Sequence, residues 1–403
     1  MKILIYSANY FPEPTGIGKY SGEMAEWLAT QGHEVRVVCA PPYYPNWELP
    51  APYRKLRYWF EQHGAVKVWR APLWVPKEPG GLKRVLHLLT FAASSLPLML
   101  RQAAWRPDVV FTVAPAFVCA PAGWLTARLS GAKAWLHIQD FEVDVAFQMG
   151  LLKGERVKSL VLWLESKMLR RFDVVSSISG RMLEKLREKK VKNERIYLFP
   201  NWVDISKISP LDEVSPYKAE LQIPAHAKVA LFSGSLGNKQ GLMVIPAAAN
   251  HLSYREDIYF VICGDGVMKH DIENATKHVK NVRLLPLQPF ARLNELLGLA
   301  DIHLLPQSPE AEDLVLPSKL SGMLSSGRPI IATVRPETDI ARIVSQCGRV
   351  VPPEDADALQ QAILELLEDT EKMNMNGHEA RNQAIQNYDQ ASILQAFAKR
   401  LSQ

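Results

Sequence analysis

The chain has 403 residues, of which 47% are hydrophobic and 22% are charged, and its formal net charge is +5. This composition is that of a globular protein with a large core, and it excludes the disordered and fibrous classes. A single core stops growing near ~250 to 300 residues, so we expect two domains. The modest charge is spread over the chain, which fits a small anionic ligand or a membrane surface and gives no support to a nucleic-acid partner.

Cysteine usage and hydropathy indicate a cytoplasmic protein. The four cysteines lie far apart and form no C-x-x-C metal or redox spacing, which is typical of a reducing compartment. The apolar start of the chain reaches Asn9 and Pro12 too early for a signal-peptide core. The longest apolar run, residues 85–100, is shorter than the ~20 residues of a spanning helix. We therefore expect at most a peripheral contact with the inner face of the cytoplasmic membrane.

Short β-branched runs alternate with helical stretches through the first half of the chain. The predicted strands are residues 2–6, 35–39, 66–70, 109–113, 134–138 and 174–178. Such alternation is typical of parallel sheets made of β-α-β units, with helices on both faces. Between the first two strands, residues 20–31 are predicted to form a helix that ends at Gly32.

The alternation pauses between Pro200 and Pro224, where prolines lie among Asp and Ser residues, and we interpret this stretch as a linker. A second series of predicted strands follows it, at residues 229–233, 258–263, 282–285, 302–305 and 329–333. The predicted organisation is therefore a first α/β domain over 1–204, a second over 205–385, and a final helix over 386–403 that could cross back to the first domain.

The first glycine motif is Gly16-Ile17-Gly18, in a loop between the first strand and the helix expected from Tyr20. Glycines at such a place let backbone amides approach a ligand closely. The motif is not the dinucleotide fingerprint, because the loop is too long, a third spaced glycine is missing and the second strand ends at Cys39 without an acidic residue. A plain turn remains the alternative.

A second glycine motif, SGSLGNKQG, occupies residues 233–241 at the carboxyl end of the first strand of the second domain. Ligands bind at that edge of open parallel sheets, and glycines, a lysine and a predicted helix start coincide there. Lys239 could neutralise a departing nucleoside diphosphate, while Gly237 leaves amides free to donate. Gly234 and Ser235 belong to the same candidate site. The alternative is a glycine-rich turn with a solvated lysine.

Three further groups of residues in the second domain are donor-binding candidates. Gly264 and Gly266 form a tight turn after the next strand, and Gln288 follows the strand after that. Ser318 and Lys319 lie at a predicted helix start, where a hydroxyl, an ammonium and free amides could meet phosphates or a ribose. A capped surface helix with an exposed lysine is the alternative there.

In the first domain, His137 and Asp140 lie near the carboxyl end of an apolar strand, with two more carboxylates at Glu142 and Asp144. An imidazole there could bind a sugar hydroxyl or move a proton, and Asp140 could orient it or bind the acceptor. A lone histidine is more often structural, but clustering with acids favours a functional role. No spacing of a metal site is present, so no metal is predicted.

Two stretches combine basic and apolar residues at helical spacing, residues 83–106 and 157–172. Such helices can lie in a membrane interface, or they can pack on a sheet like any amphipathic helix.

Together these motifs resemble the retaining glycosyltransferases of the large family four, which have two Rossmann-like, doubly wound domains facing each other across a cleft (the GT-B fold). More narrowly, they resemble the glycosyltransferases of colanic acid biosynthesis. The resemblance covers nearly the whole chain. The residues that carry it are IYSANYFPEPTGIGKY at 5–20, APPYYP at 40–45, HIQD at 137–140, PNW at 200–202 and LPSK at 316–319.

The resemblance implies an acceptor-binding first domain and a donor-binding second domain. It implies that Gly16 and Gly18 line the acceptor and phosphate side, that His137 contacts the donor sugar, and that Lys239 binds the diphosphate. Gly264 and Gly266 would then border the nucleotide. The partners it implies are a nucleotide sugar such as GDP-fucose and a lipid-linked saccharide, with no other cofactor.

The chain departs from the family pattern at two places. Many members carry an arginine where this chain has Ser235 or Leu236, and a pair of glutamates where it has Leu314 and Gly322. Ser318 and Lys319 are expected to replace part of that function. A sugar-nucleotide epimerase of the same fold and a non-catalytic nucleotide-sugar-binding subunit are the rival hypotheses.

Overall fold

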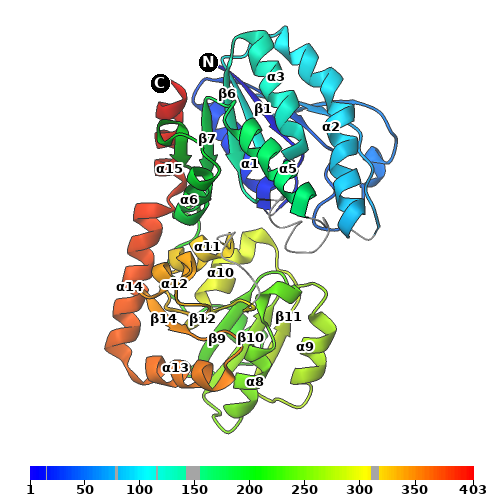
Figure 1. The fold of residues 1–403 in the computed structure, drawn as a ribbon. Helices are drawn as coiled ribbons and strands as arrows, with labels where there is room; N and C mark the ends of the chain where they lie inside the picture. The colour runs from blue at the N-terminus through cyan, green and yellow to red at the C-terminus, as the bar shows by residue number, and fades with distance from the viewer. Residues whose placement is uncertain (15, 78–79, 115–116, 142–154, 310–316) are drawn as a thin grey trace. The chain divides into compact units, whose positions relative to one another are not determined.

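The computed structural model describes residues 1–403 except 15, 78–79, 115–116, 142–154 and 310–316 (Figure 1). The chain forms two compact units. The first unit contains Met1–Pro200 and Leu394–Gln403, and the second contains Asn201–Ile393.

The first unit is built on a sheet that, over the described residues, has eight strands in the order β3-β4-β2-β1-β5-β6-β7-β8. The strands are β1 Lys2–Ser7, β2 Glu34–Cys39, β3 Trp59–His63, β4 Val66–Arg70, β5 Val109–Ala114, β6 Lys133–Ile138, β7 Val174–Ser177 and β8 Ile196–Leu198. All six predicted strands are present. β3 and β8 were not predicted, and β3 pairs antiparallel with β4. The expectation of a purely parallel sheet is therefore wrong at this edge, where a tight turn at Gly64, with φ of +56°, reverses the chain.

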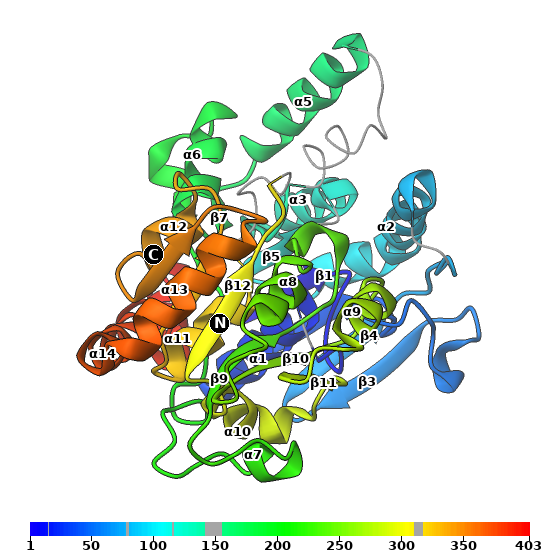
Figure 2. The same cartoon turned by 90° about the horizontal axis from the view of Figure 1, so that it is seen from below.

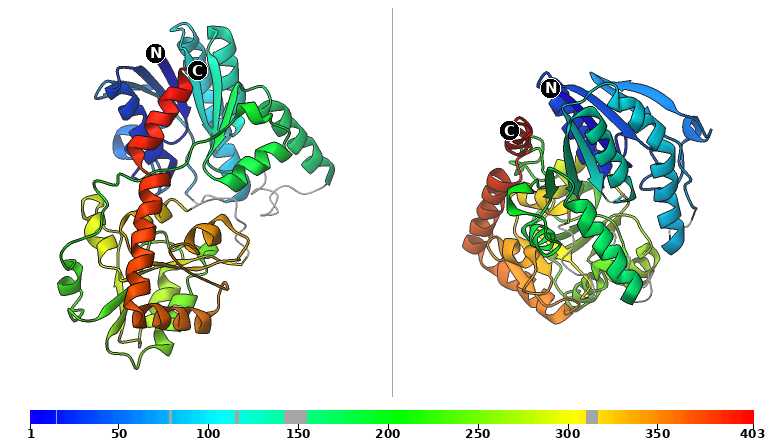
Figure 3. Two further views of the ribbon diagram at one scale, coloured as in Figure 1. Left: turned by 90° about the vertical axis from the view of Figure 1, so that its left-hand side faces the viewer. Right: turned by 45° about the horizontal axis from the view of Figure 1, so that its top comes forward.

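Helices cover both faces of this sheet. They are α1 Gly16–Thr30, α2 Gly81–Ala103, α3 Ala120–Ser130, α5 Glu155–Leu169, α6 Gly180–Glu188 and α15 Gln390–Leu401, with 3-10 turns η1 Ala51–Tyr53, η2 Phe117–Cys119 and η3 Asn193–Arg195. Phe91 and Met99 of α2 share a core with Leu4 and Leu136 of the sheet. On the other face, Phe397 of α15 stacks on Phe199, with ring centroids 4.3 Å apart. Residues of α15 thus complete the first unit, whereas the preceding helix belongs to the second (Figure 3).

The sheet of the second unit has six strands among the described residues, in the order β11-β10-β9-β12-β13-β14, and every pairing is parallel. The strands are β9 Lys228–Ser233, β10 Ile258–Cys263, β11 Val282–Leu285, β12 Ile302–Pro306, β13 Ile330–Thr333 and β14 Gly348–Val351. The five predicted strands are confirmed, and β14 is an addition.

The second unit is doubly wound, because alternate residues of β9 enter different cores. Ala230 and Phe232 pack with residues of α8 and α13, which lie side by side on one face (Figure 2). Val229 and Leu231 pack on the other face with Tyr217. The helices are α7 Tyr217–Glu220, α8 Val244–His251, α9 Lys269–Thr276, α10 Leu293–Gly298, α11 Lys319–Ser325, α12 Asp339–Val344, α13 Ala356–Glu368 and α14 Thr370–Asn387, with 3-10 turns η4 Asn238–Gln240 and η5 Phe290–Arg292.

Candidate functional site

The glycine loops after β9 and β10 lie against each other at the carboxyl edge of the second sheet. Gly234 N donates to Cys263 O over 2.9 Å, and Leu236 N donates to Asp265 O over 2.9 Å. A Cβ added to Gly264 would lie 2.0 Å from Gly234 O, and one added to Gly266 would lie 2.6 Å from Leu236 O. Glycine is therefore required at both positions for the two loops to meet.

Lys319, the first residue of α11, reaches across the end of β9 into this edge. Its Nζ donates to Gln240 Oε1 over 3.0 Å and lies 4.1 Å from the centroid of the Phe232 ring. A Cβ on Gly234, whose φ is +146°, would come within 3.3 Å of the lysine Cδ. Burial lowers the pKa of Lys319 to about 7. The structure thus brings the predicted residues Gly234 and Lys319 into contact, although 85 residues separate them in sequence.

The side chains of Ser235 and Lys239 are exposed at the same edge. The backbone of Lys239 has a structural role, because its carbonyl accepts a hydrogen bond of 3.1 Å from Ser308 N after β12. Gly237 precedes the 3-10 turn η4, which ends at Gly241 in the left-handed region with φ of +56°. The helix start predicted beside Lys239 is only the start of this 3-10 turn, since Gly241 stops it and α8 begins at Val244.

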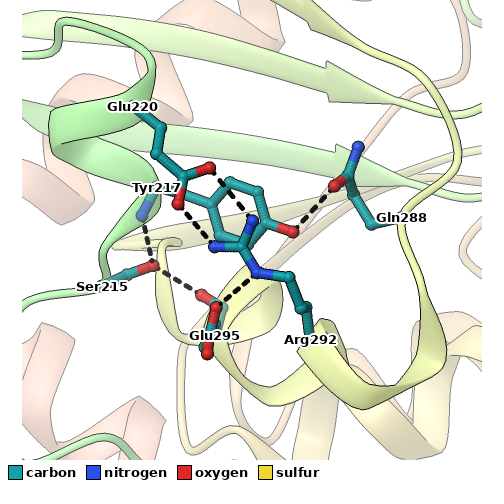
Figure 4. A network of polar contacts seen from close by, with 6 residues as sticks. All are labelled: Ser215, Tyr217, Glu220, Gln288, Arg292 and Glu295. Atoms are coloured by element: carbon teal, nitrogen blue, oxygen red, sulfur yellow. Dashed lines mark hydrogen bonds and ion pairs between the residues drawn. The ribbon is translucent and has the colours of Figure 1, made fainter.

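Gln288 lies in the loop after β11, where both ends of its amide are engaged. Figure 4 shows its contact with Tyr217. The hydroxyl of buried Tyr217 donates to Gln288 Oε1 over 2.9 Å, and Gln288 Nε2 donates to Pro286 O over 2.9 Å. Arg292 lies over the Tyr217 ring and pairs with Glu220, with its Nη2 2.6 Å from Oε1. The contacts indicate that Gln288 fixes this loop, which emerges at the same sheet edge as the glycine loops.

Ser318, the residue before α11, is exposed, and its side chain makes no capping hydrogen bond to the helix. Gly322 lies in α11, whereas Leu314 falls outside the described residues. The donor-binding candidates after β9 and β10 and at the start of α11 therefore gather at one edge of one sheet. This is the arrangement expected of an anion site in an open α/β sheet.

In the first unit, Gly16 and Gly18 lie inside the first turn of α1, which begins four residues earlier than predicted from Tyr20. A Cβ on Gly18 would lie 2.6 Å from the Cβ of Glu13, so the glycine makes room for this buried side chain. Glu13 Oε1 accepts hydrogen bonds from the amides of Tyr43 and Tyr44, at 3.1 and 3.0 Å. Burial raises the pKa of Glu13, although these bonds oppose the shift.

Arg70, like Glu13, is a buried charged residue that the sequence analysis did not single out. Its Nη2 donates to Phe11 O over 2.7 Å and its Nη1 donates to Ala40 O over 2.8 Å. Its Nε pairs with Glu61 over 2.8 Å. Arg70 and Glu13 together hold the loops after β1 and β2, which contain the motifs at 5–20 and 40–45. The alternation of β4, VKVWR, was the signal that could have revealed Arg70, because it places this residue on the same buried face as Val66 and Val68.

His137 lies within β6 and only 3% of it is exposed. Its Nδ1 is 2.9 Å from Ser176 Oγ, and its ring stacks on Phe111. Burial lowers the pKa of His137 to about 3, so the imidazole is neutral at physiological pH. Burial disfavours the imidazolium form, so of the two predicted roles the binding of a sugar hydroxyl by a neutral imidazole fits this setting better than proton transfer, and both stay predictions. Asp140 follows the strand and is half-buried, while Glu142 and Asp144 lie outside the described residues.

We expect the free energy of unfolding to fall when the pH is lowered from 7 to 5. Buried His137 should contribute about 2 kcal/mol to this loss, and buried His303 a similar amount. Burial lowers the pKa of His303 to about 3 as well. An unfolded histidine takes up a proton near pH 6.5 but a neutral buried one does not, so stability is lost as pH falls from that value. Chemical denaturation at both pH values measures the loss, and His303→Gln should reduce it. Equal losses in this variant and the wild type would contradict the assignment.

Among the residues that the structure places, no three His, Cys, Asp or Glu side chains gather as ligands for a metal ion.

These two α/β units define the GT-B class of glycosyltransferases, and solved structures share the fold over the whole chain. Sucrose-phosphate synthase from Thermosynechococcus elongatus superposes with a TM-score of 0.74 at 17% identity, covering 99% of this chain and 98% of that one. Anabaena HepE in complex with UDP gives a TM-score of 0.72 at 18% identity and covers 100% of both chains.

Sequence comparison identifies the family. Residues 15–202 match the glycosyl transferase 4-like domain, and residues 227–369 match the glycosyl transferases group 1. The colanic acid biosynthesis glycosyl transferase WcaI of Escherichia coli is 41% identical over 407 residues, which is 98% of each chain. The chain belongs to this glycosyltransferase family and is a glycosyltransferase, as the sequence motifs predicted.

Proposed function

We propose that the protein transfers a sugar, with retention of anomeric configuration, from a nucleoside diphosphate donor to a lipid-linked oligosaccharide in exopolysaccharide biosynthesis at the cytoplasmic face of the membrane. The observation that carries the donor part is the cationic edge where Lys239 and Lys319 meet the glycine loops after β9 and β10. The similarity to a colanic acid glycosyl transferase and the UDP bound by HepE support the reaction class. Fucose, with GDP-fucose as donor, is the sugar we propose by analogy.

The chemistry needs a group that stabilises the leaving diphosphate. The bond between the anomeric carbon and the phosphate oxygen breaks, a bond to the acceptor oxygen forms, and the acceptor proton passes to the leaving phosphate. The negative charge that develops on the diphosphate can be met by the Lys239 and Lys319 ammonium groups and by backbone amides of the glycine loops. The proposal accordingly involves no cofactor and no metal ion. Asp140, at the end of β6, remains our candidate for contact with the acceptor.

Two assays test this function. A thermal-shift screen of UDP, GDP and ADP should give a raised melting temperature for one of them, because a ligand that binds only the folded state stabilises it. Nucleoside diphosphate should then be released from the corresponding sugar nucleotide only when a lipid-linked acceptor is present. Turnover of the sugar nucleotide without an acceptor would favour the epimerase, and binding without turnover would favour a non-catalytic subunit.

The affinity for the selected nucleoside diphosphate should fall about five-fold between pH 7 and pH 8. Burial lowers the pKa of Lys319 to about 7, so the free protein loses this ammonium over that interval. A bound diphosphate stabilises the charged form, and binding therefore weakens as the proton is lost. Calorimetric titration at both pH values measures the effect. Lys319→Met should bind more weakly with little change between them, and a wild-type slope in this variant would contradict the role of Lys319.

A further inference from the structure

The side chain of Lys319 reaches the carboxyl edge of the second sheet through a restricted path. A Cβ on Gly234 would lie 3.3 Å from the lysine Cδ, so the glycine leaves room for the methylene chain. The Nζ atom lies 4.1 Å from the centroid of the Phe232 ring and donates to Gln240 Oε1 over 3.0 Å. An ammonium group has three N–H donors, and among the described residues Gln240 is its one hydrogen-bond acceptor. These contacts leave two N–H donors for a ligand.

The turn η4 holds Gln240 at a fixed place beside the end of β12. Ser308 N, after β12, donates to the backbone carbonyl of Lys239 over 3.1 Å. Gly241, which ends the turn, lies so close to the same segment that a Cβ there would be 2.9 Å from Gln307 O. The backbone on both sides of Gln240 is therefore anchored, and its side chain can serve as a fixed support for the ammonium group.

The carboxamide of Gln240 can orient a cation without neutralising it. An ammonium group can only donate, so the contact uses the amide oxygen, which is an uncharged acceptor. The elements in contact add no negative charge, because Lys228 is the one charged residue of β9, Lys239 is that of η4, and α11 has none besides Lys319. The acids that precede α11 lie within residues 310–316, outside the described part of the chain. A neutral acceptor leaves the whole positive charge of the lysine for an anion such as a diphosphate.

We propose that Gln240 is a positioning residue of the donor site, which holds the Lys319 ammonium group in place to meet the leaving diphosphate. Gln240 itself need not touch the donor, since it acts through Lys319. The adjacent residues of η4 then have different tasks, because Lys239 meets the diphosphate directly and Gln240 places a second cation, which belongs to α11. This inference rests on the proposed function, because the diphosphate is the group that Lys319 meets.

The protonation of Lys319 in the free protein tests the contact without any nucleotide. Competitive acetylation of amines at a series of pH values, followed by mass spectrometry of the peptide that contains Lys319, gives the midpoint of its titration. Burial lowers the pKa of Lys319 to about 7, whereas the hydrogen bond to Gln240 favours the charged form. Gln240→Met removes the acceptor and should move the midpoint about one pH unit lower. Gln240→Glu adds a carboxylate and should move it at least about one pH unit higher.

Shifts in opposite directions require a direct contact, because loosening of the turn would hydrate Lys319 and raise the midpoint in both variants. Gln386→Met is the matched control. Gln386 is exposed on α14, which contributes no residue to the candidate site, so this variant should titrate like the wild type. Circular dichroism checks that the three variants fold. The kcat for release of nucleoside diphosphate should fall about ten-fold in both Gln240 variants and stay at the wild-type value in the control.

A higher midpoint in Gln240→Met, an unchanged midpoint in either Gln240 variant, or a wild-type kcat in either of them would overturn the proposal. An equal shift in Gln386→Met would overturn it as well, since the effect would then not depend on the contact. Failure of the proposed function is recognised separately, because the labelling needs no substrate. Opposite shifts together with a wild type that releases no nucleoside diphosphate would confirm the contact and contradict the proposed transferase.

Discussion

Replacing Lys239 with alanine should lower kcat about 100-fold, which corresponds to about 2.7 kcal/mol of lost transition-state stabilisation. The Lys239 side chain is exposed at the carboxyl edge of the second sheet, and the hydrogen bond that anchors this residue to Ser308 uses the backbone carbonyl. Alanine keeps that carbonyl and removes only the ammonium. We therefore expect the melting temperature to stay within the error of the measurement while turnover falls.

Lys277→Ala is the matched control for this prediction. Lys277 is an exposed lysine of the same unit, but it follows the carboxyl end of α9, whereas the Gly266 turn precedes the amino end of that helix. The comparison requires steady-state release of nucleoside diphosphate with a lipid-linked acceptor, measured for the wild type and both variants. Near-normal turnover in Lys239→Ala would remove this lysine from the mechanism, and an equal loss in both variants would point to a general effect of surface charge.

The strands that carry the fold could be predicted because they are buried on both faces and read as short β-branched runs. Runs such as 109–113 and 258–263 are of this kind, and both lie inside observed strands. These two missed strands, β3 and β8, lie at the edges of the first sheet. β3 reads WFEQH and has a mixed composition, while β8 reads IYL and is too short to stand out as a strand. β3 and β8 are strands because each pairs with a neighbouring strand, and the local sequence does not encode that pairing.

The candidate site could be predicted in part from one rule, that ligands bind at the carboxyl edge of an open parallel sheet. That rule correctly grouped the loops after β9 and β10 with the start of α11. It could not predict that Lys319 lies on Phe232 or that Tyr217 holds Gln288, since such contacts depend on tertiary packing. The setting of His137 could not be predicted for a related reason. A histidine near a strand end can point into a core, and the sequence does not tell which side it takes.

Gly264→Ala should destabilise the second unit by about 3 kcal/mol and weaken nucleotide binding with it. The added Cβ would lie 2.0 Å from Gly234 O and 3.1 Å from the carbon of that carbonyl. Neither loop can retreat easily, because Gly264 N donates to Leu285 O and Gly234 N donates to Cys263 O. Relief of the clash must therefore break a backbone hydrogen bond or separate β9 from β10 at the edge where Lys319 and the glycine loops meet.

Gly237→Ala is the matched control, because Gly237 lies in the same loop with φ of −100° and a Cβ there would meet only Ser235 Oγ at 3.8 Å. We expect this change to stay within about 0.5 kcal/mol of the wild type. Amide hydrogen exchange in β9 and β10 measures the stability of the second unit in both variants. Exchange in β5 and β6 of the first unit is the internal reference, so the measurement holds even where the two units unfold separately. If the amides of β9 and β10 are as well protected from exchange in Gly264→Ala as in Gly237→Ala, the two loops can separate at little cost in free energy. The glycines would then not fix the approach of the two loops, and the donor edge would owe its shape to the anchoring of Lys319 instead.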